Sequence, residues 1–506
     1  MITRRKFLAV TTAVTAGAAC GIPEQLFAGT GTQNNTRHPA LLAMSQPDGK
    51  ISMQKYTRTR FFLTAKNDGS RLTEQAPLKN NSEESGLADV SVMPHRLFQT
   101  IEGFGGAFTE SAAVTWQALS PARRKEVLEG YFDRDAGHGY SLCRVHMNSC
   151  DFSLGNYAHV GTPGDVELRS FNIDRDRQAL LPFIKQAQQV AGKPINLLIS
   201  PWSPPAWMKS NGEMNHGGRL LPQYRQAWAH CFVRFIEEYT KEGLQVWGVS
   251  VQNEPAASQP WESCLYTAEE ERDFVRDFLG PALSRAGLGH VRIIVWDHNR
   301  DLMVERASVV YSDPEAARYV WGTGFHWYGE DHFDHVQLVH DAWPDKQLLS
   351  TEGCQEGGPH LGSWDLGERY ARSMINDLNR WTVGWIDWNL VLNEQGGPNH
   401  VGNFCSAPVI VDREHDAVLR QSSYYYLGHF SRFVKPGARR VLCASTRQNL
   451  EATAFINPDA SIATVVMNRT ETALRFALRV GEARMLAELP PRSIATYLTT
   501  ASNEST

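Results

Sequence analysis

The sequence predicts an α/β fold in which a (β/α)8 TIM barrel is joined to a β-sandwich built from both ends of the chain. Eight apolar, strand-like runs alternate with amphipathic helical patterns over residues 101–424. Short strand-like segments separated by turn signals occupy 51–100 and 425–500. Polar and aromatic residues follow the strands of the middle region, where barrels build their active sites. A doubly wound sheet has the same local pattern, but a count of eight favours the barrel.

Residues 1–30 predict an export signal. The paired Arg4 and Arg5 precede a short, weakly apolar stretch over 8–19, a pattern typical of twin-arginine-type signal peptides. We therefore expect an exported protein, periplasmic or extracellular. Cys20 follows two alanines, so a lipid anchor at Cys20 is the less favoured alternative to ordinary signal cleavage.

The composition is that of a folded globular protein. Hydrophobic residues make up 42% of the 506 residues and charged residues 21%. A chain of this length is too long for a single hydrophobic core of ordinary size, so we expect a large domain and a smaller one. The net charge of −5 and pI near 6.4 present no basic surface to nucleic acid. No run reaches the roughly eighteen apolar residues of a transmembrane span. Of the eight cysteines, the seven after Cys20 lack CxxC spacing, so we expect no metal, no cofactor and no disulfide framework.

Both ends of the chain supply the predicted sandwich. Over 474–480, apolar residues alternate with arginine or alanine, which is the pattern of a half-buried strand. The tripeptide Asn457-Pro458-Asp459 is typical of a turn. Residues 31–50, rich in Gly, Thr, Asn and Gln, predict a linker that precedes the first sandwich strands.

The barrel strands are predicted from short apolar runs, and the helices between them from a 3.6-residue period. Trp228, Phe232 and Tyr239 recur at helical spacing between the third and fourth runs. The next helix begins with a capping box at Thr267-x-x-Glu270. The eight runs are 100–108, 140–148, 195–201, 246–252, 291–297, 319–327, 346–351 and 383–390.

Two of these runs end in a glutamate. Glu254 follows the fourth run and Glu352 follows the seventh, and those strands lie nearly opposite each other in an eight-stranded barrel. Glycoside hydrolysis needs one carboxyl that protonates the leaving oxygen and one carboxylate that acts at the anomeric carbon. Aromatic and amide side chains that could hold a sugar ring follow the other runs. The sequence therefore predicts a paired-carboxylate sugar site at the mouth of the barrel.

Six segments, in the same order along the chain, resemble the glucosylceramidases of glycoside hydrolase family 30. The resemblance covers about residues 50–498 and implies retaining hydrolysis of the β-glucosidic bond of glucosylceramide or a related β-glucoside. The segments are TIEGFGGAFTESAA at 100–113, SPWSPPAWMK at 200–209, VSVQNEP at 249–255, FHWY at 325–328, LLSTEGC at 348–354 and GWIDWNLVLNEQGGPN at 384–399.

The resemblance implies a role for individual residues. Glu254 would be the acid/base and Glu352 the nucleophile, and retaining enzymes hold two such carboxyls roughly 5–5.5 Å apart. We expect Tyr328 and His326 to hold Glu352 by hydrogen bonds, and Arg144 to support the carboxylates from the second strand. The expected sugar contacts are Asp151, Trp202, Asn253, Tyr328, Trp388 and Asn399.

Several alternatives stay open. Each glutamate has an alternative role as an N-cap or a salt-bridge partner at a strand end. Asp151 has one as the cap of a turn, and His326 as a structural histidine. Relatives with this architecture cleave β-xylosides or β-1,6-glucans, and a catalytically silent glycolipid- or carbohydrate-binding protein would keep the same pocket. His400 stands where the resemblance leads us to expect an aromatic residue. This difference leaves the aglycone, and any association with a lipid surface, undecided.

Overall fold

The computed structural model describes residues 56–79 and 89–501. The predicted signal peptide over 1–30 and the linker over 31–50 lie outside these ranges, so both stay predictions. Among the described residues, no helix combines the length and the apolar character needed to cross a bilayer.

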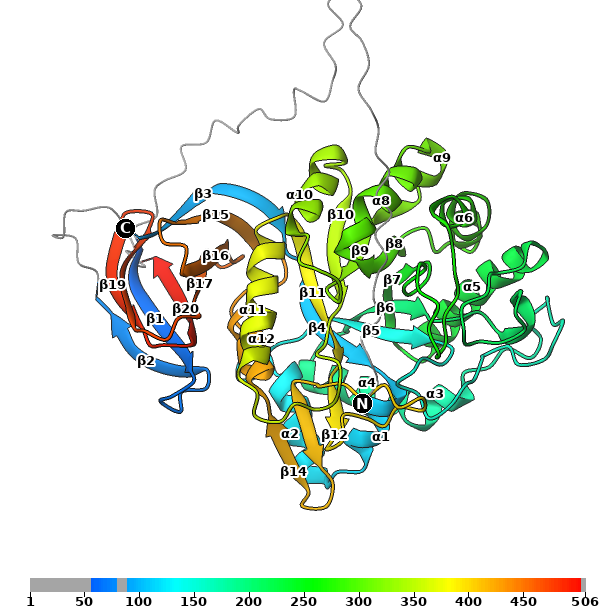
Figure 1. Ribbon diagram of the computed structural model, residues 1–506, viewed down its shortest axis with the longest axis horizontal. Helices are drawn as coiled ribbons and strands as arrows, with labels where there is room; N and C mark the ends of the chain where they lie inside the picture. The colour runs from blue at the N-terminus through cyan, green and yellow to red at the C-terminus, as the bar shows by residue number, and fades with distance from the viewer. Residues whose placement is uncertain (1–55, 80–88, 502–506) are drawn as a thin grey trace, which may run out of the picture. The chain divides into compact units, whose positions relative to one another are not determined.

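Eight parallel strands close into a barrel, as the sequence predicts (Figure 1). Each strand pairs with its predecessor in the chain, and β11 closes the ring on β4. Each predicted run overlaps one barrel strand, with ends that differ by up to three residues. The strands are almost fully buried because helices cover their outer faces. The strands are β4 (Gly103–Phe108), β5 (Leu142–Met147), β6 (Asn196–Pro201), β7 (Gln245–Ser250), β8 (Arg292–Asn299), β9 (Val320–His326), β10 (Gln347–Glu352) and β11 (Thr382–Asn389).

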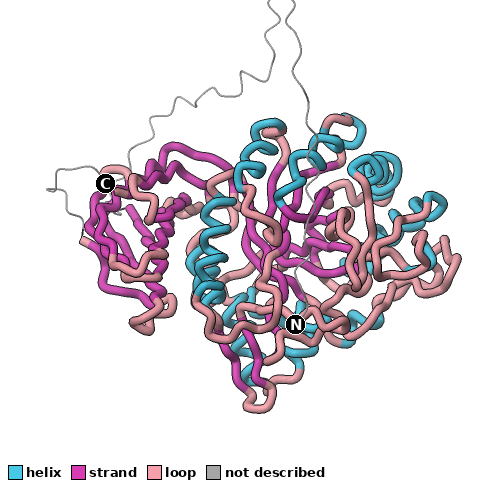
Figure 2. Tube along the Cα trace, viewed as in Figure 1, coloured by secondary structure: helices cyan, strands magenta, loops and turns pink. Residues whose placement is uncertain are grey.

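Helices surround the barrel strands, as Figure 2 shows. The predicted helical pattern is α5, in which Trp228, Phe232 and Tyr239 are fully buried. The predicted capping box begins α6, where Thr267 and Glu270 exchange hydrogen bonds between side chain and backbone. The helices are α1 (Glu110–Gln117), α2 (Pro121–Phe132), α3 (Asp174–Gln178), α4 (Leu180–Ala191), α5 (Arg225–Lys241), α6 (Ala268–Phe274), α7 (Gly280–Arg285), α8 (Met303–Tyr311), α9 (Pro314–Ala317), α10 (Phe333–Ala342), α11 (Asp365–Leu378) and α12 (Ser422–Ser431).

Strands from both chain ends form the β-sandwich, which has its own hydrophobic core. β1 pairs with β20 and β3 pairs with β15, so the N-terminal strands lie within the sheet and extend the C-terminal ones. The alternation predicted over 474–480 is β18, whose two arginines are exposed. The strands are β1 (Tyr56–Ala65), β2 (Thr73–Leu78), β3 (Val90–Thr100), β15 (Arg439–Ser445), β16 (Leu450–Ile456), β17 (Ile462–Asn468), β18 (Leu474–Val480), β19 (Ala483–Leu489) and β20 (Ser493–Ala501).

Two features near the end of the barrel differ from the sequence analysis. A small sheet of β12 (Val391–Asn393), β13 (Val409–Asp412) and β14 (Ala417–Arg420) follows the last barrel strand. α12 then runs across the boundary expected between 424 and 425, and the first C-terminal sandwich strand begins only at Arg439.

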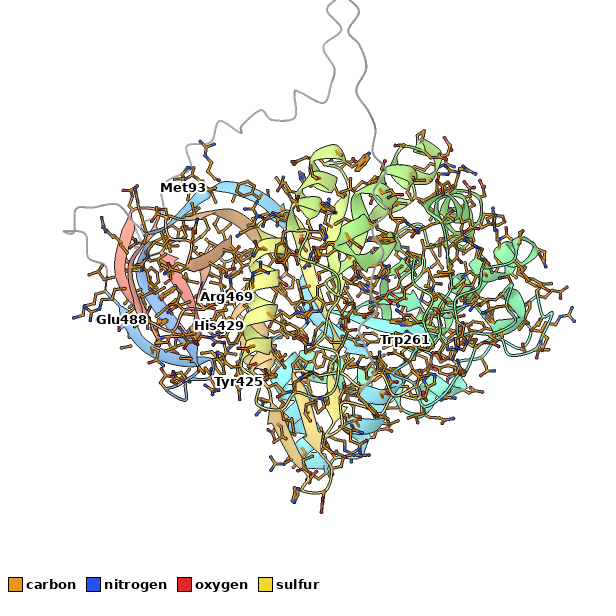
Figure 3. All side chains as sticks on the ribbon, viewed as in Figure 1. Met93, Trp261, Tyr425, His429, Arg469 and Glu488 are labelled. Atoms are coloured by element: carbon orange, nitrogen blue, oxygen red, sulfur yellow. The ribbon has the colours of Figure 1, made fainter. Side chains whose placement is uncertain are left out.

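His429, labelled in Figure 3, ties α12 to the sandwich. Its Nε2 lies 2.9 Å from Oγ1 of Thr64 on β1, and its Nδ1 lies 2.9 Å from Oγ1 of Thr496 on β20. Burial lowers the pKa of His429 to about 3, so the imidazole is neutral and has one donor and one acceptor for the two hydroxyls. The first and last strands of the sandwich thus meet on one helix.

The GFGGAF segment of β4 is a site of close packing. A Cβ on Gly105 would lie 1.8 Å from the carbonyl oxygen of Leu142 on β5, and a Cβ on Gly103 would lie 2.6 Å from Oγ of Ser141. Only glycine allows the backbones of β4 and β5 to approach this closely.

We expect Gly105→Ala to destabilise the protein by about 3 kcal/mol or more, because the clash is with backbone that cannot move without opening the barrel. Chemical denaturation of both proteins measures this change. Gly289→Ala is the matched control, since a Cβ at Gly289 meets nothing within 4 Å. Equal midpoints for the two variants would contradict the packing argument.

Candidate active site

The carboxyl ends of the barrel strands bring the sequence-predicted site residues to one end of the barrel. Glu352 is the last residue of β10, and Trp388 is the second to last of β11. Asn253 and Glu254 lie in the turn that follows β7. Because β7 and β10 are separated in the ring by β8 and β9, the two glutamates enter the mouth from different sides.

Short hydrogen bonds hold both carboxylate oxygens of Glu352. Nη1 of Arg144 donates to Oε2 at 2.8 Å, and the Tyr328 hydroxyl donates to Oε1 at 2.8 Å. Arg144 itself is fully buried and reaches Asn253 with its Nη2, at 2.9 Å from Oδ1. A guanidinium donates only, so Oδ1 of Asn253 faces Arg144 and its NH2 group is oriented away from the guanidinium.

Asp297 accepts four hydrogen bonds at the centre of this network. Donors are Nη2 of Arg144, Oγ of Ser250 and Oγ1 of Thr351, each at 2.6 Å, and the His326 ring at 3.0 Å. Burial opposes the charge of this carboxylate, but the guanidinium of Arg144 and the hydrogen bond from His326 outweigh it. They hold the pKa of Asp297 well below its ordinary value. The sequence analysis did not select Asp297, although it ends the fifth strand-like run.

His326 contacts a different glutamate from the one expected. Its Nδ1 lies 3.3 Å from Oε1 of Glu254 and its Nε2 lies 3.0 Å from Oδ1 of Asp297, so it does not hold Glu352 by a hydrogen bond. Burial opposes its charge, but the negative charge of Glu352 and the bonds to Asp297 and Glu254 raise the pKa of His326 to about 9. His326 is therefore an imidazolium between two carboxyls, because both ring nitrogens face acceptors.

Longer contacts surround Glu254. Besides His326, Nε2 of Gln259 lies 3.4 Å from its Oε2, and Nε2 of His298 lies 3.7 Å from its Oε1. The backbone of Glu254 is left-handed, with a φ of 48°, and Trp296 and Asp297 have φ values of 73° and 52°. Non-glycine residues adopt this region at a cost of about 1–3 kcal/mol, and such strain gathers at functional sites.

Glu254 and Glu352 titrate as a coupled pair. Burial raises the pKa of Glu352, the charge of Glu254 adds to the rise, and His326 and Arg144 oppose it. Burial also raises the pKa of Glu254, but the hydrogen bond from His326 and the charge of His298 bring it below its ordinary value. These directions favour a proton on Glu352. The hydrogen-bond lengths favour it on Glu254, whose donors lie at 3.3 and 3.4 Å while those of Glu352 lie at 2.8 Å.

Two tryptophans form an aromatic floor beside the carboxylates. The rings of Trp202 and Trp388 stack with centroids 5.0 Å apart and planes inclined by 22°. The Arg144 guanidinium lies 4.8 Å from the centroid of the Trp202 ring, so the same cation supports the floor and Glu352. Trp261, labelled in Figure 3, packs against the cluster that contains this floor.

Asp151 is held by two amides from the loop between β12 and β13. Nδ2 of Asn399 donates to Oδ2 of Asp151 at 3.2 Å, and Nδ2 of Asn403 donates to the same oxygen at 3.0 Å. Burial raises the pKa of Asp151 to about 8, although the hydrogen bonds from the two amides act in the opposite direction. The sequence analysis selected Asn399 and missed Asn403, which is four residues further along the same loop.

His400, which is partly buried, lies beside Asp151 and pairs with the buried Glu262. Nδ1 of His400 lies 3.0 Å from the carbonyl oxygen of Asp151 and 3.2 Å from that of Ser153. Carbonyls only accept, so this nitrogen carries the proton. Its Nε2 lies 3.4 Å from Oε2 of Glu262, which is fully buried. The residue that departs from the resemblance thus fastens the Asp151 loop.

Comparison with known proteins decides the family. The glycosyl hydrolase family 30 TIM-barrel domain matches residues 101–434, and the β-sandwich domain of the same family matches 437–497. This chain belongs to glycosyl hydrolase family 30. Lysosomal acid glucosylceramidase of Mus musculus is 39% identical over 441 residues, which cover 83% of this chain and 85% of the mouse protein.

Two solved structures have the same fold as this chain. SrfJ from Salmonella typhimurium is 38% identical with a TM-score of 0.84, over 87% of this chain and 99% of SrfJ. The endo-β1,6-glucanase BT3312 is 29% identical with a TM-score of 0.81, over 88% of this chain and 100% of the glucanase. The protein is a family 30 glycoside hydrolase, close to the glucosylceramidases.

We expect Arg144→Gln to destabilise the protein by about 3–5 kcal/mol at neutral pH, because two buried carboxylates lose their cation. The depressed pKa of Asp297 gives the sign of the pH dependence. The contribution of ionised Asp297 to the free energy of unfolding is complete above its unfolded pKa of about 3.9 and is lost as the pH falls through its folded pKa. The loss of stability in the variant should therefore become smaller in acid. Denaturation at several pH values measures it, with the exposed Arg318→Gln as control. A deficit independent of pH would exclude the electrostatic cause.

Proposed function

We propose that this protein is a retaining β-glucosidase in which Glu352 is the nucleophile and Glu254 the acid/base. The observation that carries the proposal is the unequal setting of the two buried carboxyls. Both oxygens of Glu352 accept 2.8 Å bonds, one from a guanidinium, and short charge-assisted bonds stabilise an anion. Glu254 has only the longer contacts. Since coupled carboxyls exchange a proton as a pair, we assign the proton to Glu254 when substrate binds.

In the first step, an oxygen of Glu352 bonds to the anomeric carbon as the glycosidic C–O bond breaks. The proton of Glu254 goes to the departing aglycone oxygen, so the alcohol leaves neutral. The ester on Glu352 removes a negative charge that had raised the pKa of His326. Glu254, now ionised, keeps the His326 imidazolium as its partner.

In the second step, Glu254 takes a proton from water as the water oxygen bonds to the anomeric carbon and the ester bond breaks. Glu352 leaves as a carboxylate and the sugar is released with its original β configuration. Tyr328 and Arg144 receive the returning anion in an arrangement that needs no reorganisation.

For the sugar, we propose that Trp202 and Trp388 cover the apolar ring face while Asp151, Asn253 and Asn399 bind hydroxyls. The stacked floor supports this assignment, as does the NH2 group of Asn253 that the Arg144 contact orients. Asn403 shares Oδ2 of Asp151 with Asn399 and joins the proposed set. Tyr328 borders the same space through its bond to Glu352.

For the aglycone, we propose an apolar chain such as that of glucosylceramide, presented by a lipid surface. Leu154, Leu361, Val401 and Phe404 are 37–54% exposed on loops that follow β5, β10 and β12. These loops touch: the backbone N–H groups of residues 357 and 358 donate to the Phe404 carbonyl, and His400 contacts Ser153 beside Leu154. We call these four side chains the apolar rim. The similarity to BT3312 favours a β-1,6-glucan as the second candidate substrate.

We expect Glu352→Ala to lose at least about 10⁴-fold in kcat on an aryl β-glucoside, because no ester can form. Added azide distinguishes the two glutamates, because each variant gives a different anomer of the glucosyl azide. With Glu352→Ala it yields the α-glucosyl azide, whereas with Glu254→Ala it attacks the glycosyl ester and yields the β-azide. Proton NMR distinguishes the products. Glu356→Gln, at an exposed residue on the loop that follows β10, is the control. An α-anomer as the first product of the wild-type enzyme would refute retention.

We expect Leu154→Ser and Phe404→Ser each to lower kcat/KM on detergent-dispersed glucosylceramide by about 10-fold, since each removes apolar contact area from the rim. Hydrolysis of a short aryl β-glucoside should stay within about 2-fold. Leu338→Ser on α10, which is equally exposed at 50%, is the control. Equal losses on both substrates would reject the rim as an aglycone site, and preferential cleavage of β-1,6-linked glucose would favour the glucanase alternative.

A further inference from the structure

A cavity of about 580 Å³ lies away from the sugar site, between α2, α12 and the turn that joins β1 to β2. Arg71 and Leu72 line it from the sandwich, and Lys125, Arg420 and Tyr424 line it from the elements around the barrel. Tyr425, labelled in Figure 3, is a further wall residue on α12. None of its lining residues belongs to the sugar site described above.

Positive charge exceeds negative charge in this cavity. Arg71, Lys125, Arg420 and Arg432 line it against two acids, Glu126 and Glu129. Both acids are already engaged. Glu126 pairs with Arg123 at 2.6 Å and with Arg420 at 3.1 Å, and Glu129 lies 3.5 Å from Lys125.

Two of the guanidiniums have no carboxylate partner within residues 56–79 and 89–501. Arg71 donates to the carbonyls of Ala65 and Ser70, both at 2.7 Å, and Arg432 donates to the carbonyl of Asp135 at 3.3 Å. Burial lowers the pKa of Arg432 and the charge of Arg60 adds to the effect, and these outweigh the opposing influence of Tyr424, Glu74 and Asp133. Placing a desolvated cation beside other cations is unfavourable unless an anion offsets it.

His138 is a second, independent sign of a ligand. It is 1% exposed, lines the cavity and has no hydrogen-bond partner for either ring nitrogen among the described residues. Its ring lies 4.1 Å from that of Tyr424. Burial lowers the pKa of His138 to about 3, so the ring is neutral and has one unused donor and one unused acceptor. Buried polar atoms in native proteins are normally paired.

The backbone beside the cavity is strained at Leu72 and closely packed at Gly428. Leu72 has a left-handed φ of 51°, held by Oγ1 of Thr64, which accepts from its backbone N–H at 2.8 Å. A bulky residue adopts this conformation only where its surroundings impose it. Gly428 on α12 lies beneath, and a Cβ there would be 2.4 Å from Leu72 Cδ1 and 2.7 Å from His138 Nε2.

Aromatic rings orient the guanidiniums. Arg71 lies 4.7 Å from the centroid of the Trp364 ring and 5.8 Å from that of Tyr425, and Arg420 lies 5.4 Å from that of Tyr424. A planar guanidinium held in this way offers a rigid fork that matches two oxygens of a phosphate. The cavity is larger than a phosphate alone, and its tyrosines offer faces to an organic remainder.

We propose that this cavity binds the phosphate group of a small phosphomonoester, with Arg71, Arg420 and Arg432 as its anchors. The bound group would neutralise the excess charge and reach His138, and it would join the β1–β2 turn to α12. The site is independent of the glycosidase chemistry, so its test does not rest on the proposed function.

Isothermal titration of the full chain with glycerol 3-phosphate, at constant ionic strength, tests the site. We expect saturable binding that Arg71→Gln and Arg432→Gln each weaken by at least about 10-fold, because each removes a charge-assisted fork. Arg318→Gln, an exposed guanidinium paired with Glu315, should bind as the wild type does. Circular dichroism melts confirm that the variants fold, and glycerol and chloride serve as ligand controls.

The alternatives have distinct outcomes. Absence of saturable binding, or equal affinity in all variants, overturns the proposal. Inorganic phosphate that binds as tightly as glycerol 3-phosphate keeps the phosphate site and rejects an organic remainder. Retention of the wild type on phosphatidate vesicles, lost in Arg71→Gln and Arg432→Gln, identifies the phosphate source as a lipid headgroup.

Discussion

The candidate active site depends on one buried carboxylate, that of Asp297, which takes no part in the proposed reaction. Asp297 is the common acceptor for Arg144 and His326, and these two cations reach Glu352 and Glu254 respectively. Without it, both cations would lie in the barrel with only the proposed nucleophile and acid/base as counter-charges. The Asp297 carbonyl also accepts from the backbone N–H of Glu254. A single side chain and its backbone thus set the relative positions of the pair, and such a network is worth more than its separate bonds.

Backbone strain and the burial of charge both oppose this arrangement. Three residues of the site, Glu254, Trp296 and Asp297, have left-handed backbones, and several charges are removed from water. The strain is maintained by elements outside the mouth: Oε1 of Glu271 on α6 accepts from the Trp296 backbone N–H at 2.7 Å. The rigid barrel therefore supplies the stability that the site lacks, which is the usual division between scaffold and function.

Local patterns predicted the barrel well because each strand is a short apolar run whose neighbours in the sheet are its neighbours in sequence. The same patterns placed Glu254 and Glu352 at strand ends. They could not predict which partner each side chain finds across the mouth, since register and rotamer decide whether His326 reaches Glu254 or Glu352. Asp297 was missed for the same reason, because its place at the end of a strand-like run does not show which side chains it contacts. The β12–β14 sheet was missed because its strands are three or four residues long and β12 pairs with β13 across a long intervening loop.

The pairing of β1 with β20 joins residues as distant as Tyr56 and Ala501, and this has a consequence for how the protein folds. The sandwich cannot close until β20 has been synthesised. The barrel, whose strands pair with sequence neighbours, can form first. Until then β3 and the edge of β1 opposite β2 lack their partner strands and are able to pair with another chain. Contacts of such large sequence separation form slowly, so completion of the sandwich is the step at which aggregation competes with folding.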